Sequence, residues 1–279
     1  MENNSHELST IQKIELEALK ELKTFCQNNG ISFFLRGGSV MGAIKYSGFV
    51  PWDDDADIAV PRDQYDKLIQ LTKENEWSKK FYISSYKYEE KMHCYFPRVF
   101  LKEEYITLYN LPRNNEMGLT LVDILPLDGA PNNFFAREIY YLKVYAYRAL
   151  AGVWTLSDKK TVNMHDKKKR FILKVLELFK VNKLYTQRNI YEKLDKLYKK
   201  YDYKTQKNIG TITGSLYKKE IFPSRYWGDG IWKSFEGEQF LVPKEYDDYL
   251  KKLYGNDYLT RTPSDKEKYF KKHIKDKNL

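Results

Sequence analysis

The stretch Pro-Trp-Asp-Asp-Asp-Ala-Asp-Ile-Ala-Val, residues 51–60, places four carboxylates directly before an apolar run. Side chains alternate between the two faces of a strand, so Asp53, Asp55 and Asp57 are expected on one face. Like charges at this spacing repel, and their burial without partners is costly. We therefore expect a cation nearby, and hard carboxylate oxygens favour Mg²⁺ or Mn²⁺. The alternative is an acidic loop in solvent, with Asp53 or Asp54 capping a turn.

The stretch lies within an alternation of predicted helices and strands. The hydrophobic periodicity predicts helices over 7–28, 40–46 and 62–74, and strands over 31–35, 58–60, 81–86, 95–101, 105–109 and 119–125. The first 130 residues are therefore predicted to form a mixed α/β unit.

A glycine turn precedes the acidic stretch. Gly37-Gly38-Ser39 follows the predicted strand at 31–35 and opens a small helix. Glycine lets a ligand approach the backbone closely, and a helix N-terminus favours phosphate. We expect Gly37, Gly38 and Ser39 to cradle a phosphate, and Lys45 to add a contact. The alternatives are a turn without a ligand and a lysine in solvent.

A third carboxylate, Asp123, lies inside the apolar run at 119–125, where an isolated charge is expensive to bury. If this strand neighbours the one at 58–60, Asp123 joins Asp55 and Asp57 around one or two metal ions, an arrangement that serves phosphoryl transfer. The alternative is an ion pair between Asp123 and an arginine such as Arg98.

The pattern changes after residue 131, which predicts a boundary between a catalytic core at 1–131 and a second part at 132–279. Helices are predicted over 134–150, 167–181 and 186–201, and an aromatic-rich segment, 217–258, is expected to complete the active-site cleft. Residues 165–200 hold twelve Lys and Arg against four Asp and Glu, so they supply most of the net charge of +10. Such an excess favours polyanionic partners.

Composition excludes several classes of protein. A chain of 279 residues with 42% hydrophobic residues can build a sizeable core, so disorder is excluded as the main state. No apolar run reaches the ~20 residues that span a bilayer. The N-terminus lacks the features of a signal peptide, which predicts a cytoplasmic protein. With two cysteines and no paired spacing, disulfides and structural zinc are not expected.

The order of these motifs resembles the nucleotidyltransferase superfamily, whose core is a small mixed sheet flanked by helices. The predicted class is therefore α+β, with a helical, basic C-terminal part. The segment 42–58 is similar to the LicD branch, phosphocholine transferases that also resemble the fukutin-related proteins. Segments 122–129 and 235–255 are similar to two further LicD blocks. The family often has Gly-Thr where this chain has Gly38-Ser39, and Arg where it has Lys45, but hydroxyl and charge are kept.

The resemblance implies a metal-dependent phosphotransferase. It would transfer phosphocholine from CDP-choline to a sugar hydroxyl of a cell-surface glycopolymer precursor, of the teichoic acid or lipopolysaccharide type, and release CMP. Asp55 and Asp57 would hold Mg²⁺ (or Mn²⁺) on the diphosphate, and Asp123 would hold a second ion or act as base. Aromatic side chains would bind the quaternary ammonium of choline through cation–π contacts. The alternative is that these side chains pack in the core. The candidates are Trp52, Tyr226, Trp227 and Trp232.

The resemblance would also explain the positive charge of the predicted basic helices. An anionic glycopolymer or a lipid-linked acceptor would be attracted to residues 167–200. Peripheral contact with the inner face of the cell membrane is left open, as is simple packing of these helices with lysines in solvent. Alternative activities are transfer from CDP-linked ethanolamine, glycerol or ribitol, nucleotidyl transfer, or nucleic-acid binding. No nucleic acid is expected, because a binding protein gains nothing from a concentrated negative site.

Overall fold

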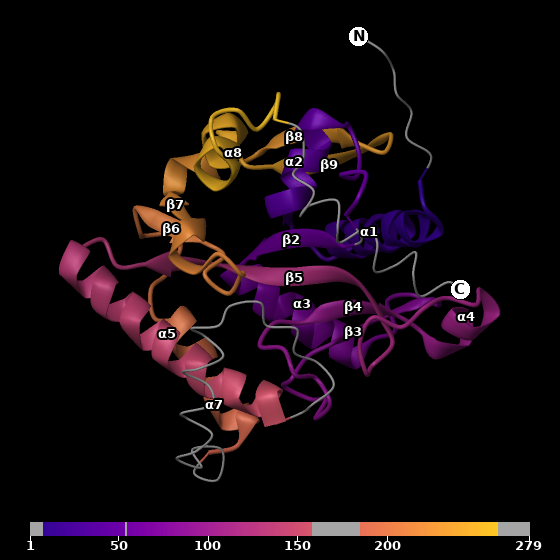
Figure 1. The fold of residues 1–279 in the computed structure, drawn as a ribbon, viewed down its shortest axis with the longest axis horizontal. Coiled ribbons are helices and arrows are strands. Elements are labelled where there is room, and N and C mark those ends of the chain that lie inside the picture. Colours follow the sequence, from indigo (N-terminus) through magenta and orange to yellow (C-terminus); the bar gives the residue numbers. More distant parts are fainter. Residues whose placement is uncertain (1–7, 54, 158–184, 262–279) are drawn as a thin grey trace.

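The structure of the protein, a computed structural model, describes residues 8–53, 55–157 and 185–261 (Figure 1). Its centre is a mixed sheet in which seven strands follow one another in the order β3-β4-β5-β2-β1-β9-β8. Two more strands, β6 and β7, extend from β5. The mixed sheet with flanking helices confirms the predicted fold class.

The described chain contains nine strands and seven α-helices. The strands are β1 (Phe34–Leu35), β2 (Ala56–Pro61), β3 (Phe81–Ser84), β4 (Arg98–Leu101), β5 (Leu119–Ala130), β6 (Asn208–Gly210), β7 (Ile221–Pro223), β8 (Ile231–Phe235) and β9 (Glu238–Val242). The α-helices are α1 (Thr10–Asn28), α2 (Gly37–Lys45), α3 (Arg62–Glu74), α4 (Glu103–Leu108), α5 (Phe134–Ser157), α7 (Gln187–Tyr198) and α8 (Tyr246–Tyr254), with 3₁₀ turns η2 (Tyr217–Glu220) and η3 (Ser224–Tyr226).

The longest strand, β5, joins the two parts of the sheet. Its residues 119–123 pair antiparallel with β4, residues 122–127 pair in parallel with β2, and the last residues, Asp128 to Ala130, pair with β6. At the other edge, β9 from the C-terminal part pairs in parallel with β1. Both predicted parts, 1–131 and 132–279, therefore contribute strands to the same sheet.

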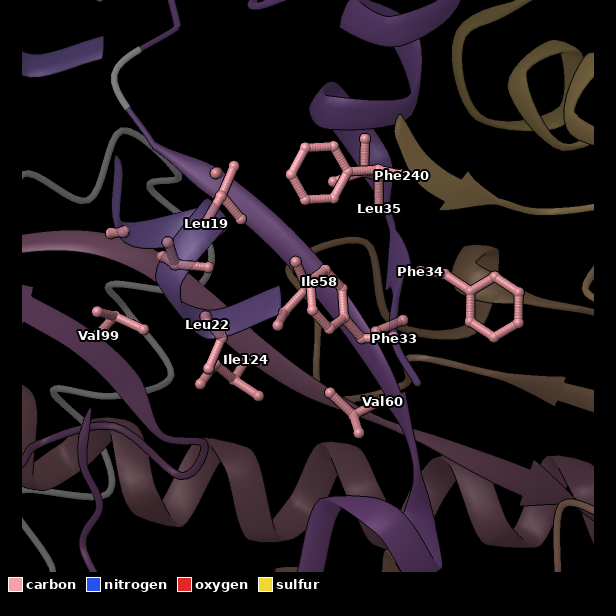
Figure 2. Packing of buried hydrophobic residues seen from close by; sticks show 14 of the residues in the cluster. Leu19, Leu22, Phe33, Phe34, Leu35, Ile58, Val60, Val99, Ile124 and Phe240 are labelled. Atoms are coloured by element: carbon pink, nitrogen blue, oxygen red, sulfur yellow. The ribbon is translucent and has the colours of Figure 1, made fainter. Parts of the chain in front are cut away.

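Helix α1 covers the centre of the sheet. It begins with a capping box in which the hydroxyl of Ser9 and the amide side chain of Gln12 each bond to the backbone of the other. Figure 2 shows Leu19 and Leu22 of this helix lying over Ile58 and Ile124 of the two central strands. This packing makes β2 and β5 buried strands, so a charge on them needs a partner.

The C-terminal half adds a second layer, in which α5 and α7 lie side by side (Figure 1). Their facing residues form a separate hydrophobic cluster that includes Tyr140, Val144, Ile190 and Leu194. Within the described ranges, none of the helices combines the length and apolarity needed to cross a bilayer.

Most predicted elements are present, with three differences. The prediction of a strand over 105–109 is wrong, because these residues belong to α4 and its C-cap. The acidic side chains of Glu103 and Glu104 stabilise the N-terminus of this helix. The expected glycine turn is already helical, since α2 begins at Gly37. The strand expected over 31–35 is reduced to β1. The helix predicted over 167–181 lies outside the described residues.

Candidate active site

Two of the predicted site residues, Asp57 and Asp123, stand opposite each other on the parallel strands β2 and β5. Arg98 on β4 is opposite Asp123 on its other side. Residues in register on adjacent strands point to the same face of a sheet. The sheet therefore aligns two carboxylates and a guanidinium in one row.

Asp57 is held by a buried arginine that sequence analysis did not identify. Arg36, which lies between β1 and α2 and is only 6% exposed, places Nη1 3.0 Å from Asp57 Oδ1. Its Nη2 pairs with Glu220 and its Nε donates to Thr211 Oγ1 at 3.2 Å. Arg36 thus joins a candidate catalytic residue to the C-terminal part of the chain.

Glu220 is itself enclosed, with 1% exposure. Besides Arg36, it accepts hydrogen bonds from the Thr211 hydroxyl at 2.7 Å and from the Leu216 N–H at 2.9 Å. A buried carboxylate with this many donors is well satisfied. It therefore fixes the 211–216 loop against Arg36.

Asp123 pairs with Arg98, the alternative partner that the sequence suggested. Arg98 Nε lies 2.8 Å from Asp123 Oδ1, and Nη2 donates to Oδ2 at 3.2 Å. Both carboxylate oxygens thus contact one guanidinium. This ion pair satisfies the charge of Asp123 in the structure.

Negative charge nevertheless exceeds positive charge around this row. Burial, with the charges of Asp123 and Glu220, raises the pKa of Asp57 to about 6 although Arg36 opposes the rise. Burial also raises the pKa of Asp123, against the opposing effect of Arg98. Asp55 lies exposed just before β2. A further cation would relieve this excess.

The donor types fit a divalent metal ion, since Asp57 and Asp123 offer hard oxygens on one face of the sheet and Asp55 offers them just before β2. In the described part of the chain, however, no three His, Cys or acidic side chains are grouped closely enough to form a metal site. The oxygens of Asp57 and Asp123 contact arginines instead. The metal set Asp55, Asp57 and Asp123 stays a prediction.

The glycine motif packs directly against the aspartates. Ser39 Oγ accepts a hydrogen bond from the Asp57 N–H at 2.9 Å, and the Gly37 N–H donates to Tyr249 Oη at 2.8 Å. Gly37 has a positive φ of 53°, which favours glycine. A Cβ on Gly38 would lie 2.6 Å from Asp53 Oδ2. This motif therefore fixes the start of β2, and a side chain at Gly38 would displace the carboxylate of Asp53.

A pocket of about 160 Å³ opens beside this motif. Three predicted substrate-binding residues, Gly38, Lys45 and Trp52, line it. Other lining residues are Met41, Tyr46, Val50, Asp53, Tyr254, Tyr258 and Arg261. The chain thus brings together a glycine, aromatic rings and charged groups, which suits a ligand with both an apolar and a charged part.

Lys45 has a structural role in this pocket. Its Nζ donates to the backbone carbonyls of Tyr258 at 3.2 Å and Arg261 at 2.9 Å. The lysine therefore holds the segment after α8 against α2. Contact between Lys45 and a phosphate stays a prediction.

Of the four aromatic candidates, only Trp52 lines the pocket; its ring meets Tyr46 edge to face, 6.0 Å between centroids. Trp227 is buried against Phe34 and Tyr249 in the core. Tyr226 packs on Phe222, and Trp232 lies exposed on β8. Core packing is therefore the role of Trp227.

Three residues of the site had no clear signal in the sequence. Arg36 directly precedes Gly37, and a charge between an apolar strand and a glycine motif could have marked it. Glu220 and Tyr249 lie in charged, aromatic-rich segments that look like ordinary surface. Their partners are about 180 to 210 residues away in sequence, beyond the range of local patterns.

Comparison with known proteins agrees with this geometry. Residues 30–133 match the family described as LicD/FKTN/FKRP, nucleotidyltransferase domain. These residues include α2, β2 and β5, which carry the motif and the aspartates. The lipopolysaccharide cholinephosphotransferase LicD of Haemophilus influenzae is 28% identical over 265 residues, 92% of this chain and 93% of that protein. The part of the chain that carries the candidate site, residues 30–133, is thus similar to the nucleotidyltransferase domain of this family, and most of the chain is similar to the Haemophilus protein.

Proposed function

We propose that this protein transfers phosphocholine from CDP-choline to a sugar hydroxyl of a cell-surface glycopolymer precursor, and that it releases CMP. The observation that carries the proposal is the register of Asp57 with Asp123, next to the Gly37–Ser39 motif and an aromatic pocket. The Haemophilus relative, a lipopolysaccharide cholinephosphotransferase, supports phosphocholine as the transferred group.

The donor carries two phosphates and a quaternary ammonium, and the site offers groups for each. Gly38 leaves open space at the start of α2, where backbone N–H groups favour phosphate. The rings of Trp52, Tyr46 and Tyr254 line the same pocket and suit a trimethylammonium group. The choline end of the donor therefore fits this pocket, with the diphosphate toward Asp57.

Asp55, Asp57 and Asp123 would hold Mg²⁺ or Mn²⁺, which when bound supplies positive charge against the diphosphate and the leaving CMP. Arg36 and Arg98 keep the carboxylates of Asp57 and Asp123 in place. The raised pKa of Asp123 also makes it a candidate to take the proton of the acceptor hydroxyl, as an alternative to holding a second ion.

The test is CMP release from CDP-choline by the purified protein, with lipopolysaccharide or a teichoic acid precursor as acceptor. We expect release that needs Mg²⁺ or Mn²⁺ and that is lost in Asp55→Asn and Asp57→Asn. Asp63→Asn is the matched control, because this aspartate lies on α3 and bonds to Tyr203 and Lys204. Full activity of both site variants would contradict the proposal.

A panel of donors tests the transferred group. CDP-ethanolamine, CDP-glycerol and CDP-ribitol lack the quaternary ammonium, so CDP-choline should be preferred if the aromatic pocket binds choline. Trp52→Ala should then weaken CDP-choline more than CDP-glycerol. Equal use of CDP-glycerol by the unchanged protein would point to another CDP-linked substrate.

A further inference from the structure

One side of α5 exposes large apolar side chains. Phe134, Phe135, Ile139 and Leu142 are 59%, 75%, 55% and 69% exposed. Residues 135, 139 and 142 follow the four- and three-residue steps of one helix face. The opposite side of the helix packs into the molecule through residues such as Tyr140 and Val144. An apolar stripe of this kind usually marks an interaction surface.

Cations flank this stripe. Lys143 is exposed on α5 itself. The turn η2 lies beside the helix, because Lys218 Nζ is 3.7 Å from Glu138 Oε2 and the ring centroid of Tyr217 is 5.1 Å from that of Tyr145. This turn adds the exposed Lys218 and Lys219, and the residue before it adds another exposed apolar group. That residue is Leu216, 40% exposed.

We propose that this surface, the α5 face, binds the surface of an anionic lipid bilayer. The α5 face consists of the four apolar residues of α5 with Lys143, Leu216, Lys218 and Lys219. A helix that rests on a membrane buries an apolar stripe at the acyl boundary and keeps its cations at the headgroups. Each lysine near an anionic surface adds attraction, and the chain carries a net charge of +10.

The α5 face is connected to the candidate active site. Turn η2 ends at Glu220, which pairs with Arg36, and Arg36 pairs with Asp57. Two ion pairs, Glu220–Arg36 and Arg36–Asp57, thus connect the turn at the α5 face to the candidate catalytic carboxylate. This extends the proposed function by favouring a lipid-borne acceptor, although membrane binding itself does not depend on that function.

The test is flotation of the purified protein with vesicles, in the absence of any donor or acceptor. We expect binding to phosphatidylcholine vesicles that contain phosphatidylglycerol, and little binding to phosphatidylcholine alone. The double variant Phe135→Ser with Leu142→Ser should bind about tenfold more weakly. Lys218→Glu with Lys219→Glu should weaken binding and reduce its dependence on salt.

Leu108→Ser is the matched control. Leu108 is 70% exposed on α4, at the opposite end of the molecule from α5 in Figure 1, so this variant should bind as the unchanged protein does. Retained binding in the double variant would overturn the proposal, as would no binding of the unchanged protein to anionic vesicles.

Two other occupants of the α5 face give different results, and either would also overturn the proposal. If a second copy covers it, the unchanged protein is a dimer in sedimentation experiments and the double variant is a monomer. If the chain itself covers it, the double variant unfolds several degrees lower. CDP-choline binding, measured by calorimetry, should be unchanged in the double variant, so failure of the membrane proposal leaves the transferase proposal standing.

Discussion

Replacement of Asp57 with asparagine should stabilise the protein at neutral pH although it removes a partner of Arg36. The carboxyl is partly buried beside Asp123 and Glu220, and its pKa rises to about 6. Arg36 would keep Glu220 as its ion-pair partner, and the amide oxygen of asparagine could accept the hydrogen bond from Arg36. The variant therefore removes an excess negative charge without leaving an unpaired cation.

The size of the effect follows from the pKa. A carboxyl with a pKa of 3.8 when unfolded and about 6 when folded lowers stability by about 3 kcal/mol, since each tenfold change in proton affinity is worth ~1.4 kcal/mol. The side chain is 23% exposed, so we expect about 1–3 kcal/mol.

The effect has a defined pH window. The folded state holds the proton more tightly, so ionisation of Asp57 costs nothing below the unfolded pKa, costs more as the pH rises, and reaches its full cost above about 6. Stability of the unchanged protein should therefore fall relative to Asp57→Asn between about pH 4 and 6, and the two should be equal below that range.

Urea unfolding followed by tryptophan fluorescence, in EDTA, at about pH 4 and about pH 7.5, measures this difference. Asp63→Asn removes an exposed aspartate with ordinary surface partners and should show no gain. If Asp57→Asn is less stable than the unchanged protein at neutral pH by more than about 1 kcal/mol, the Arg36–Asp57 pair is favourable on balance. The site would then hold no excess of negative charge.

Three further substitutions test the surroundings of the site. Arg36→Met should lower the free energy of unfolding by about 3–5 kcal/mol in urea, because it leaves two enclosed carboxylates without their shared cation; a loss below about 1 kcal/mol would contradict the network. Gly38→Ala should cost no more than about 0.5 kcal/mol, because its Cβ would meet only the movable carboxylate of Asp53, but it should weaken CDP-choline binding in calorimetry because the methyl enters the pocket; unchanged affinity would refute this. In Cys94→Ser, the thiol of Cys26, whose pKa is raised to about 12 by burial, should react with Ellman's reagent only after denaturation; rapid labelling of the folded protein would show that it is accessible.

The local features of the core could be predicted from the sequence. Pro61 ends the apolar strand and precedes a helix that runs from Arg62 to Glu74, the bounds expected from its periodicity. The apolar run around Asp123 also predicted a buried strand and a need for a charge partner. In both cases a short window of residues contains the physical cause, which is amphipathic spacing or the cost of an isolated charge.

The rest depends on pairing between distant segments. Strand β9 lies beside β1 because Phe34 is in register with Leu241, and a two-residue strand gives no periodic signal of its own. Glu220 ends a Tyr-Lys-Lys-Glu turn that looks like solvent-exposed surface, yet it is buried because Arg36 and the 211–216 loop surround it. Only the assembled sheet shows which charges are inside.

The assembled sheet also separates the two members of the Asp-x-Asp pair. Asp55 is exposed and Asp57 is partly buried against Arg36, so the same change to asparagine has different effects on the fold. At Asp55 it should alter stability by no more than about 0.5 kcal/mol, as for other exposed positions, whereas at Asp57 it should stabilise. If both changes nevertheless abolish CMP release, loss of activity cannot be due to unfolding. The role of the two carboxylates would then be in what they bind, because one contributes no more than about 0.5 kcal/mol to stability and the other lowers it.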